Sequence, residues 1–437
     1  MRRLIPLIAS LALLAPSCPR DYGPPDYDPD ATRSFVPGSS GDDLVYVAAG
    51  SAKGDSDYVM AMPSGETLAR IDGPDRRGWA FASSRVAYYP MLSASANSSN
   101  TIHRIDLRTG ARARLVADQR LGLPLFDEAG RFDQGSPGFT ALALTAADTR
   151  LVVARVLSAG PRVWIGRYDT SSGTLETERS WPISAIAANV RLAARGDLLV
   201  VVTSTRTDGG KIEDEMRLLD PSLRELIALS ASDLPPDERC SAGLQSLDGA
   251  RWVTVCANPV GRHASVLVLD DTYRIGSRIP LKLEVRERVI AWTAQHGSVA
   301  ILTDRARHIR VGNDGNPTTS WLAEPDGRTA VRVAREIAPG IVVAQLITNP
   351  EGTVVGETAL LELATGRVLA RATAPAIALD FVGAGDRLYA LLPSTDGLGP
   401  RLQRLDRESL APVGLAARLP QRDDVRVGGL IAVIPAR

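Results

Sequence analysis

The segment LELATG at residues 361–366 decides the fold, because it recurs as IDLRTG at residues 105–110. Both copies place an acidic residue after an apolar one and end on Thr-Gly, a combination typical of a tight turn. Looser copies bring the number to eight. They lie 43 to 63 residues apart when the equivalent positions are Ala61, Asp106, Asp169, Asp220, Asp270, Asn313, Glu362 and Asp406. Repeats of about this length are typical of architectures that stack one small structural unit on the next.

Short apolar or alternating stretches flank each copy, as at residues 198–203, 299–303 and 341–347. They have the length of strands, are too short for helices, and are bounded by turn-forming residues. A further tight turn lies upstream, for example at residues 195–197. Four short strands per unit, with no helical pattern between units, predict an all-β fold, a β-propeller of four-stranded antiparallel blades. The eight turns favour eight blades, and two weak copies leave seven as the alternative.

The ends of the repeat region predict how the ring closes. One four-stranded sheet cannot bury both of its faces, so the blades must pack face to face around an axis. Residues 425–435 form an apolar stretch without a turn of their own, and the first copy, starting near Leu44, lacks an innermost strand. We therefore expect a single propeller domain over residues 42–437, closed by the C-terminal strand in the first blade.

The amino terminus has the features of a secretory signal. Arg2 and Arg3 precede an apolar run at residues 4–15, which is too short to span a bilayer. Residues 15–18 (APSC) resemble a bacterial lipoprotein box, which implies a signal peptide over residues 1–17 and lipidation of Cys18; ordinary cleavage after Ser17 is the alternative. Residues 18–41, rich in Pro, Asp, Gly and Ser, predict a tether. We expect export to the bacterial cell envelope, periplasmic or at the outer surface, with membrane contact only through the lipid.

Composition excludes some classes of function. The chain has 437 residues with 50 basic and 50 acidic side chains, so it lacks the charge expected of a nucleic-acid-binding protein. Its four histidines have no Cys or His partner at the spacing of a metal site, which predicts no metal site. No phosphate-binding Gly-rich loop or nucleophile elbow occurs, and we expect no cofactor.

The repeat resembles that of the quinoprotein-like eight-bladed propellers, whose Asp-x-x-Thr-Gly turn is followed by a docking Trp, and of bacterial surface-layer-type propellers. The docking position holds Arg114, Thr177 and Ala370 in this chain. The resemblance covers about a dozen residues per unit and implies the fold rather than an activity.

Two further cysteines, Cys240 and Cys256, lie eight residues on either side of Asp248. A hairpin centred there places them opposite or nearly opposite each other, within reach of a disulfide. An exported location favours oxidation, and a pair of buried free thiols is the alternative.

Loop lengths predict a binding face. The turns between first and second strands and between third and fourth strands are short, whereas the loops on the other face are long, including residues 204–213, 348–357 and the crossing at 117–138. Long loops on a rigid scaffold accumulate binding residues, although tolerated insertions are the alternative. The crossing holds the candidate residues Phe126, Asp127, Glu128, Arg131, Phe132 and Asp133. These could bind a partner, act as acid and base, hold a cation or form a self-satisfied cluster.

These observations favour a noncatalytic binding or scaffold protein that holds an unknown protein or saccharide partner on the long-loop face. The alternative is an exported propeller enzyme, such as a polysaccharide lyase, glycosidase or quinone-dependent dehydrogenase. A third possibility is a purely structural surface protein.

Overall fold

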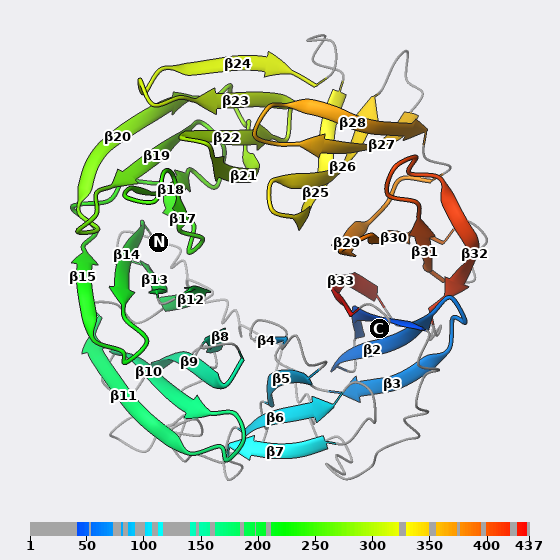
Figure 1. Ribbon diagram of the computed structural model, residues 1–437, viewed down its shortest axis with the longest axis horizontal. Coiled ribbons are helices and arrows are strands. Elements are labelled where there is room, and N and C mark those ends of the chain that lie inside the picture. The colour runs from blue at the N-terminus through cyan, green and yellow to red at the C-terminus, as the bar shows by residue number, and fades with distance from the viewer. Residues whose placement is uncertain are drawn as a thin grey trace, which may run out of the picture.

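The computed structural model describes residues 42–51, 54–72, 80–81, 86–91, 101–106, 112–116, 140–145, 148–157, 162–183, 188–196, 198–206, 211–322, 329–348, 355–373, 376–394, 399–419 and 426–434. Within these ranges the chain forms eight antiparallel sheets, seven of four strands and one of five. The sheets follow one another around a ring (Figure 1). The predicted β-propeller is confirmed, and the number of sheets is the one that the sequence favoured.

We number the blades along the chain and give their strands from the axis outward. Blade 1 contains β33 (Arg426–Ile434), β1 (Asp43–Ser51), β2 (Gly54–Met62) and β3 (Thr67–Asp72). Blade 2 contains β4 (Ala80–Phe81), β5 (Val86–Met91), β6 (Thr101–Asp106) and β7 (Arg112–Val116). Blade 3 contains β8 (Thr140–Thr145), β9 (Arg150–Leu157), β10 (Arg162–Asp169) and β11 (Leu175–Pro182). Blade 4 contains β12 (Ala188–Arg195), β13 (Leu198–Arg206), β14 (Ile212–Leu219) and β15 (Glu225–Leu229).

Blade 5 contains β16 (Arg239–Cys240), β17 (Gln245–Ser246), β18 (Trp252–Ala257), β19 (His263–Leu269) and β20 (Ile275–Lys282). Blade 6 contains β21 (Val289–Gln295), β22 (Ser298–Thr303), β23 (Arg307–Val311) and β24 (Pro317–Trp321). Blade 7 contains β25 (Thr329–Ala338), β26 (Ile341–Thr348), β27 (Val355–Glu362) and β28 (Arg367–Thr373). Blade 8 contains β29 (Asp380–Ala384), β30 (Arg387–Leu392), β31 (Arg401–Leu405) and β32 (Pro412–Arg418).

The sequence of each strand matches its depth in the blade. Strand β22 (SVAILT) is buried at every position, because the second strand of a blade is covered on both faces by neighbouring sheets. Strand β28 (RVLARAT) alternates exposed and half-buried residues, because it forms the outer edge. The hydrophobic core therefore lies between blades. The cluster between blades 7 and 8, for example, includes Ile337, Leu360 and Phe381.

The ring is closed by β33, which pairs antiparallel with β1 and so supplies the innermost strand of blade 1. A buried polar contact reinforces the junction between blades 8 and 1. The Tyr389 hydroxyl donates a hydrogen bond of 2.5 Å to Asp43, and Arg387 forms an ion pair with the same carboxylate at 3.3 Å. Both Tyr389 and Asp43 are buried.

The repeated turn joins the third and fourth strands, and its acidic residue stabilises the turn itself. In blade 5, Asp270 accepts hydrogen bonds from the Thr272 hydroxyl and from the backbone N–H groups of Thr272 and Arg274. In blade 7, Gly366 closes the turn with a hydrogen bond to the Glu362 carbonyl and has a φ of 73°. A Cβ at Gly366 would lie 2.7 Å from the His308 ring of blade 6. Glycine is needed there for both reasons.

Acid should destabilise the protein through these turns. Hydroxyl groups, followed by backbone N–H groups, hold the pKa of Asp169, Asp270 and Asp406 below the ordinary value of 3.8. A carboxylate whose pKa is lowered in the folded state stabilises the fold above its unfolded pKa, and that contribution is lost as the pH falls through the folded pKa. We expect the thermal midpoint to fall from about pH 5 towards pH 2, and to fall less steeply in the triple variant Asp169→Asn, Asp270→Asn, Asp406→Asn. Calorimetry at each pH measures both.

The matched control for this prediction is Asp271→Asn. Asp271 lies in the same turn as Asp270, is exposed, and its side chain makes no hydrogen bond among the described residues. If the triple variant and the control show the same pH dependence, the turn carboxylates are not the source of the acid sensitivity.

Candidate functional site

A cavity opens where the inner strands of blades 4 to 7 end, at the face that carries the turns between first and second strands. Its volume is about 740 Å³. We call it the mouth pocket. Its lining includes Arg195, Gln245, Trp252, Gln295, Glu336 and Ile337. They come from β12, β17, β18, β21 and β25, and the inner strands among these line one side of the centre of the ring in Figure 1. Cavities of about 300–1,000 Å³ are typical of small-ligand sites.

Two polar side chains of the mouth pocket are held in place by the fold. The Gln245 carbonyl oxygen accepts hydrogen bonds from the Ala294 N–H at 2.7 Å and from the Thr293 hydroxyl at 3.3 Å, both in the next blade. One oxygen of Glu336 accepts a hydrogen bond from the Gly340 N–H at 2.8 Å. Among the described residues, the Gln245 amide nitrogen and the second Glu336 oxygen have no hydrogen-bond partner, so both are available to a ligand.

The rim of the pocket is fixed by contacts between turns. The Gly297 N–H donates a hydrogen bond of 3.0 Å to the Leu247 carbonyl, which joins the turns of blades 5 and 6. Gln295 lies against Gly340 of blade 7, since a Cβ at Gly340 would lie 2.1 Å from the Gln295 amide nitrogen. Gly340 also has a φ of 71°, so both the backbone conformation and the contact with Gln295 exclude a side chain at this position. A rim of this kind holds its polar groups in one geometry before any ligand arrives.

The charges of the mouth pocket lie on different blades. Arg195, at the end of β12 in blade 4, is exposed and forms no ion pair or side-chain hydrogen bond within the described ranges. Glu336 belongs to blade 7 and forms no ion pair with a described residue. The pocket therefore presents a cation at one side and a carboxylate at the other, with amide groups between them.

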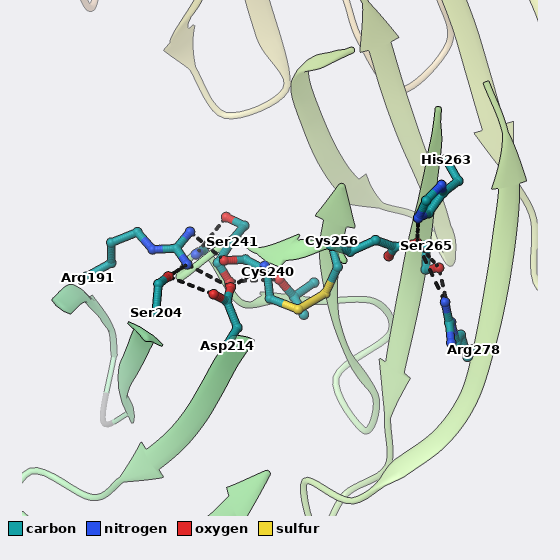
Figure 2. Close-up of a disulfide and its surroundings, with 12 residues drawn as sticks. Arg191, Ser204, Asp214, Cys240, Ser241, Cys256, His263, Ser265 and Arg278 are labelled. Carbon is teal, nitrogen blue, oxygen red and sulfur yellow. Dashed lines mark hydrogen bonds and ion pairs between the residues drawn. A yellow bond between two sulfur atoms is a disulfide. The ribbon is translucent and has the colours of Figure 1, made fainter. Parts of the chain in front are cut away.

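A second polar cluster surrounds the disulfide between Cys240 and Cys256 (Figure 2). These residues face each other across β16 and β18. Asp214, whose side chain is fully buried, accepts hydrogen bonds from the Cys240 N–H, from Ser204 at 2.7 Å and from Arg191 at 2.8 Å. Arg191 also donates to the Cys240 carbonyl at 2.7 Å. The cluster ties the short strand β16 to blade 4 and has a structural role.

A third cluster lies on the outer side of the same disulfide. Glu238 is buried next to Ser265, Arg278 and His263, with distances of 3.1, 3.6 and 3.8 Å from its Oε1 atom. Burial raises the pKa of Glu238, and the Ser265 hydroxyl, Arg278 and His263 oppose the rise. Ser265 is itself fully buried, so it cannot reach a substrate. These contacts fix the crossing from blade 4 to blade 5.

The innermost part of blade 5 differs from the predicted four strands, because two short strands, β16 and β17, pair with β18 in place of one. The Ser241 N–H still reaches the Val255 carbonyl at 2.9 Å, so the interruption follows Ser241.

The predicted site residues of the long crossing, Phe126, Asp127, Glu128, Arg131, Phe132 and Asp133, lie outside the described residues, as does Cys18. The mouth pocket was missed, although the sequence contains its turns. The turn at residues 195–197 was predicted only as a connection between strands, and the turns at 248–250, 296–297 and 339–340 are of the same kind. The polar residues that precede them at the ends of inner strands are the signal that could have identified the pocket.

Among the described residues no three His, Cys, Asp or Glu side chains are grouped as a metal site. The part of the chain that the structure describes also contains no helix with the length and hydrophobicity to cross a membrane.

No protein-family model matches the chain, and no curated protein is similar to it. Solved structures are similar in fold. A prolyl endopeptidase has a TM-score of 0.47 and 13% identity, covering 81% of this chain and 50% of its own. AztD from Citrobacter koseri has a TM-score of 0.49 and 10% identity, covering 89% and 98%. Saccharomyces cerevisiae Sqt1 has a TM-score of 0.47 and 8% identity, covering 79% and 86%. The chain spans about half the length of the prolyl endopeptidase, and its similarity to these β-propeller proteins is one of fold alone.

Proposed function

We propose that this protein is exported to the bacterial cell envelope, is anchored there by a lipid on Cys18, and acts as a noncatalytic binding protein. The observation that carries the binding role is the mouth pocket, in which hydrogen bonds from the fold orient Gln245 and Glu336. Each of them keeps one polar atom that no described residue binds. Groups oriented in advance bind a ligand without the entropic cost of ordering them. The ring of eight sheets provides the rigid support.

The buried carboxylates support a noncatalytic role. Asp214, Glu287 and Asp380 each form an ion pair with an arginine, at 2.8, 2.8 and 2.7 Å. An acid–base pair would instead need carboxyl groups that face a substrate from across a cleft. These three side chains are nearly or fully buried and hold neighbouring segments together.

Two features support export. The n-region, apolar run and APSC segment at residues 2–18 are those of a secretory signal followed by a lipoprotein box. The disulfide between Cys240 and Cys256 is of the kind that persists in an oxidising compartment rather than in the cytosol. The long-loop face, including residues 126–133, stays a second predicted surface for a protein or saccharide partner.

Replacing Cys18 should release the protein from the membrane. We expect nearly all wild-type protein in the membrane fraction of a bacterial host, and nearly all of the Cys18→Ala variant in the soluble or secreted fraction, because the lipid on Cys18 is the anchor that this proposal assigns. Cell fractionation with immunoblotting measures the shift, and mass spectrometry of the mature amino terminus detects the lipid.

The matched control is Ser17→Ala, which keeps the cysteine and should stay with the membrane. A mature chain that begins at Met1 in the cytoplasm would contradict export. A soluble exported chain that begins at Cys18 without lipid would contradict the anchor alone.

A further inference from the structure

We propose that the mouth pocket binds a short oligosaccharide. This inference deepens the proposed binding role and assigns it a ligand class and a site. Three properties of the pocket carry it: the mixture of hydrogen-bond donors and acceptors, the aromatic and apolar floor, and the arrangement of these groups along an arc of four blades.

The hydrogen-bonding groups match a ligand rich in hydroxyls. The amide nitrogen of Gln245 is a donor, because its carbonyl oxygen is occupied by Ala294 and Thr293. The free oxygen of Glu336 is an acceptor, because the other oxygen is held by Gly340. The Gln295 side-chain amide offers both a donor and an acceptor, and it makes no hydrogen bond with another described residue. A sugar hydroxyl donates and accepts at one atom, so it can satisfy planar amide and carboxylate groups in succession.

The floor of the pocket is apolar and carries an aromatic ring. Leu244, Ala294 and Ile337 are buried and line it. Trp252 is half-buried and is held by Tyr273, with ring centroids 6.0 Å apart and planes at 40°. An aromatic ring fixed by a neighbour offers a flat apolar surface next to polar groups. A pyranose ring presents the same combination, with C–H groups on its faces and hydroxyls around its edge.

The arrangement favours an elongated ligand. Successive blades contribute Arg195, Gln245, Gln295 and Glu336, so the polar groups follow the curve of the ring. The volume of about 740 Å³ is within the range for a ligand of a few sugar units.

A peptide partner fits the pocket less well. Peptide anchors are usually large aromatic or aliphatic side chains that enter deep apolar pockets. The rim of the mouth pocket consists instead of small and polar residues, among them Gly196, Ser246 and Pro339. The binding energy must therefore come from side-chain hydrogen bonds, which suits a saccharide.

The test uses the mature protein purified from the envelope and four probes: cellotriose, triacetylchitotriose, trigalacturonate and trialanine. Isothermal titration calorimetry and tryptophan fluorescence measure binding up to millimolar concentration. We expect at least one trisaccharide to bind and trialanine not to bind. Gln295→Ala and Glu336→Gln should each weaken binding by about tenfold or more, as expected for the loss of one hydrogen bond to a charged or buried group.

The matched control is Glu408→Gln, an exposed glutamate in the outer turn of blade 8, which should leave binding unchanged. The thermal midpoint of each variant shows whether it is folded. Absence of trisaccharide binding by folded wild-type protein would overturn the proposal. Trisaccharide binding whose affinity is unchanged in both Gln295→Ala and Glu336→Gln would overturn it as well. Binding of trialanine alone, weakened by the same variants, would replace the saccharide with a peptide. None of these outcomes affects the test of export, which depends on where the chain is found.

Discussion

A chain that ends at residue 425 should fail to form a stable ring. Strand β33 pairs with β1 from Leu44 to Gly50 and contacts β29 of blade 8, so its removal exposes an unpaired strand edge and apolar surface at the seam between blades 8 and 1. The loss should equal or exceed the whole stability of an ordinary domain, about 5–15 kcal/mol. We expect aggregated or degraded protein on expression. Solubility, size-exclusion chromatography and thermal unfolding measure the effect.

Two comparisons show whether the loss of ring closure causes the instability of the truncated chain. A chain that lacks only residues 435–437 keeps β33 and should fold as the full chain does. Tyr389→Phe removes only the hydrogen bond to Asp43 at the same seam and should cost about 1–2 kcal/mol. Cooperative unfolding of the truncated chain at the wild-type midpoint would show that the ring does not depend on β33.

Asp214→Ala should lower the free energy of unfolding by about 3 kcal/mol. The substitution leaves the guanidinium of Arg191 and the backbone N–H of Cys240 without their shared acceptor in a buried region. Breaking a buried ion pair by removing one partner costs about 3–5 kcal/mol. We take the lower end because the Arg191 side chain is 32% exposed. Urea unfolding under oxidising conditions measures the loss with the disulfide intact.

The neighbouring residue Glu213 provides the control. Its pair with Lys211 spans 3.8 Å and is exposed at both ends, with 45% and 38% of the side chains accessible. An exposed pair of this kind contributes less than about 1 kcal/mol, so Glu213→Ala should be nearly neutral. Equal effects of the two substitutions would show that Asp214 does not anchor β16.

The repeat could be predicted from the sequence because each turn is a local structure. Asp270 and Asp406 bind backbone and hydroxyl groups within four residues, so the same few residue types recur wherever the turn recurs. The alternation of strand β28 and the continuous burial of strand β22 likewise follow from the period of apolar residues. The fold class and the positions of the turns could therefore be predicted without knowledge of any contact between distant segments.

The mouth pocket could not be predicted in this way. Gln245 and Ala294 are 49 residues apart, and Glu336 lies another blade away, so only the closed ring brings them to one cavity. The anchoring of β16 has the same origin, since Arg191 and Cys240 are also 49 residues apart. In blade 5, Arg191 and Asp214 of blade 4 hold Cys240 of the short inner strand β16, and no local pattern encodes these contacts.

The closing strand also sets the order in which this protein can mature. Strand β33 follows every other strand in the chain, yet it occupies the innermost position of the first blade. During synthesis at about 5–20 residues per second, β1 must wait many seconds for its partner. Throughout that interval the growing polypeptide carries an unpaired β1 edge and an open seam between blades 8 and 1.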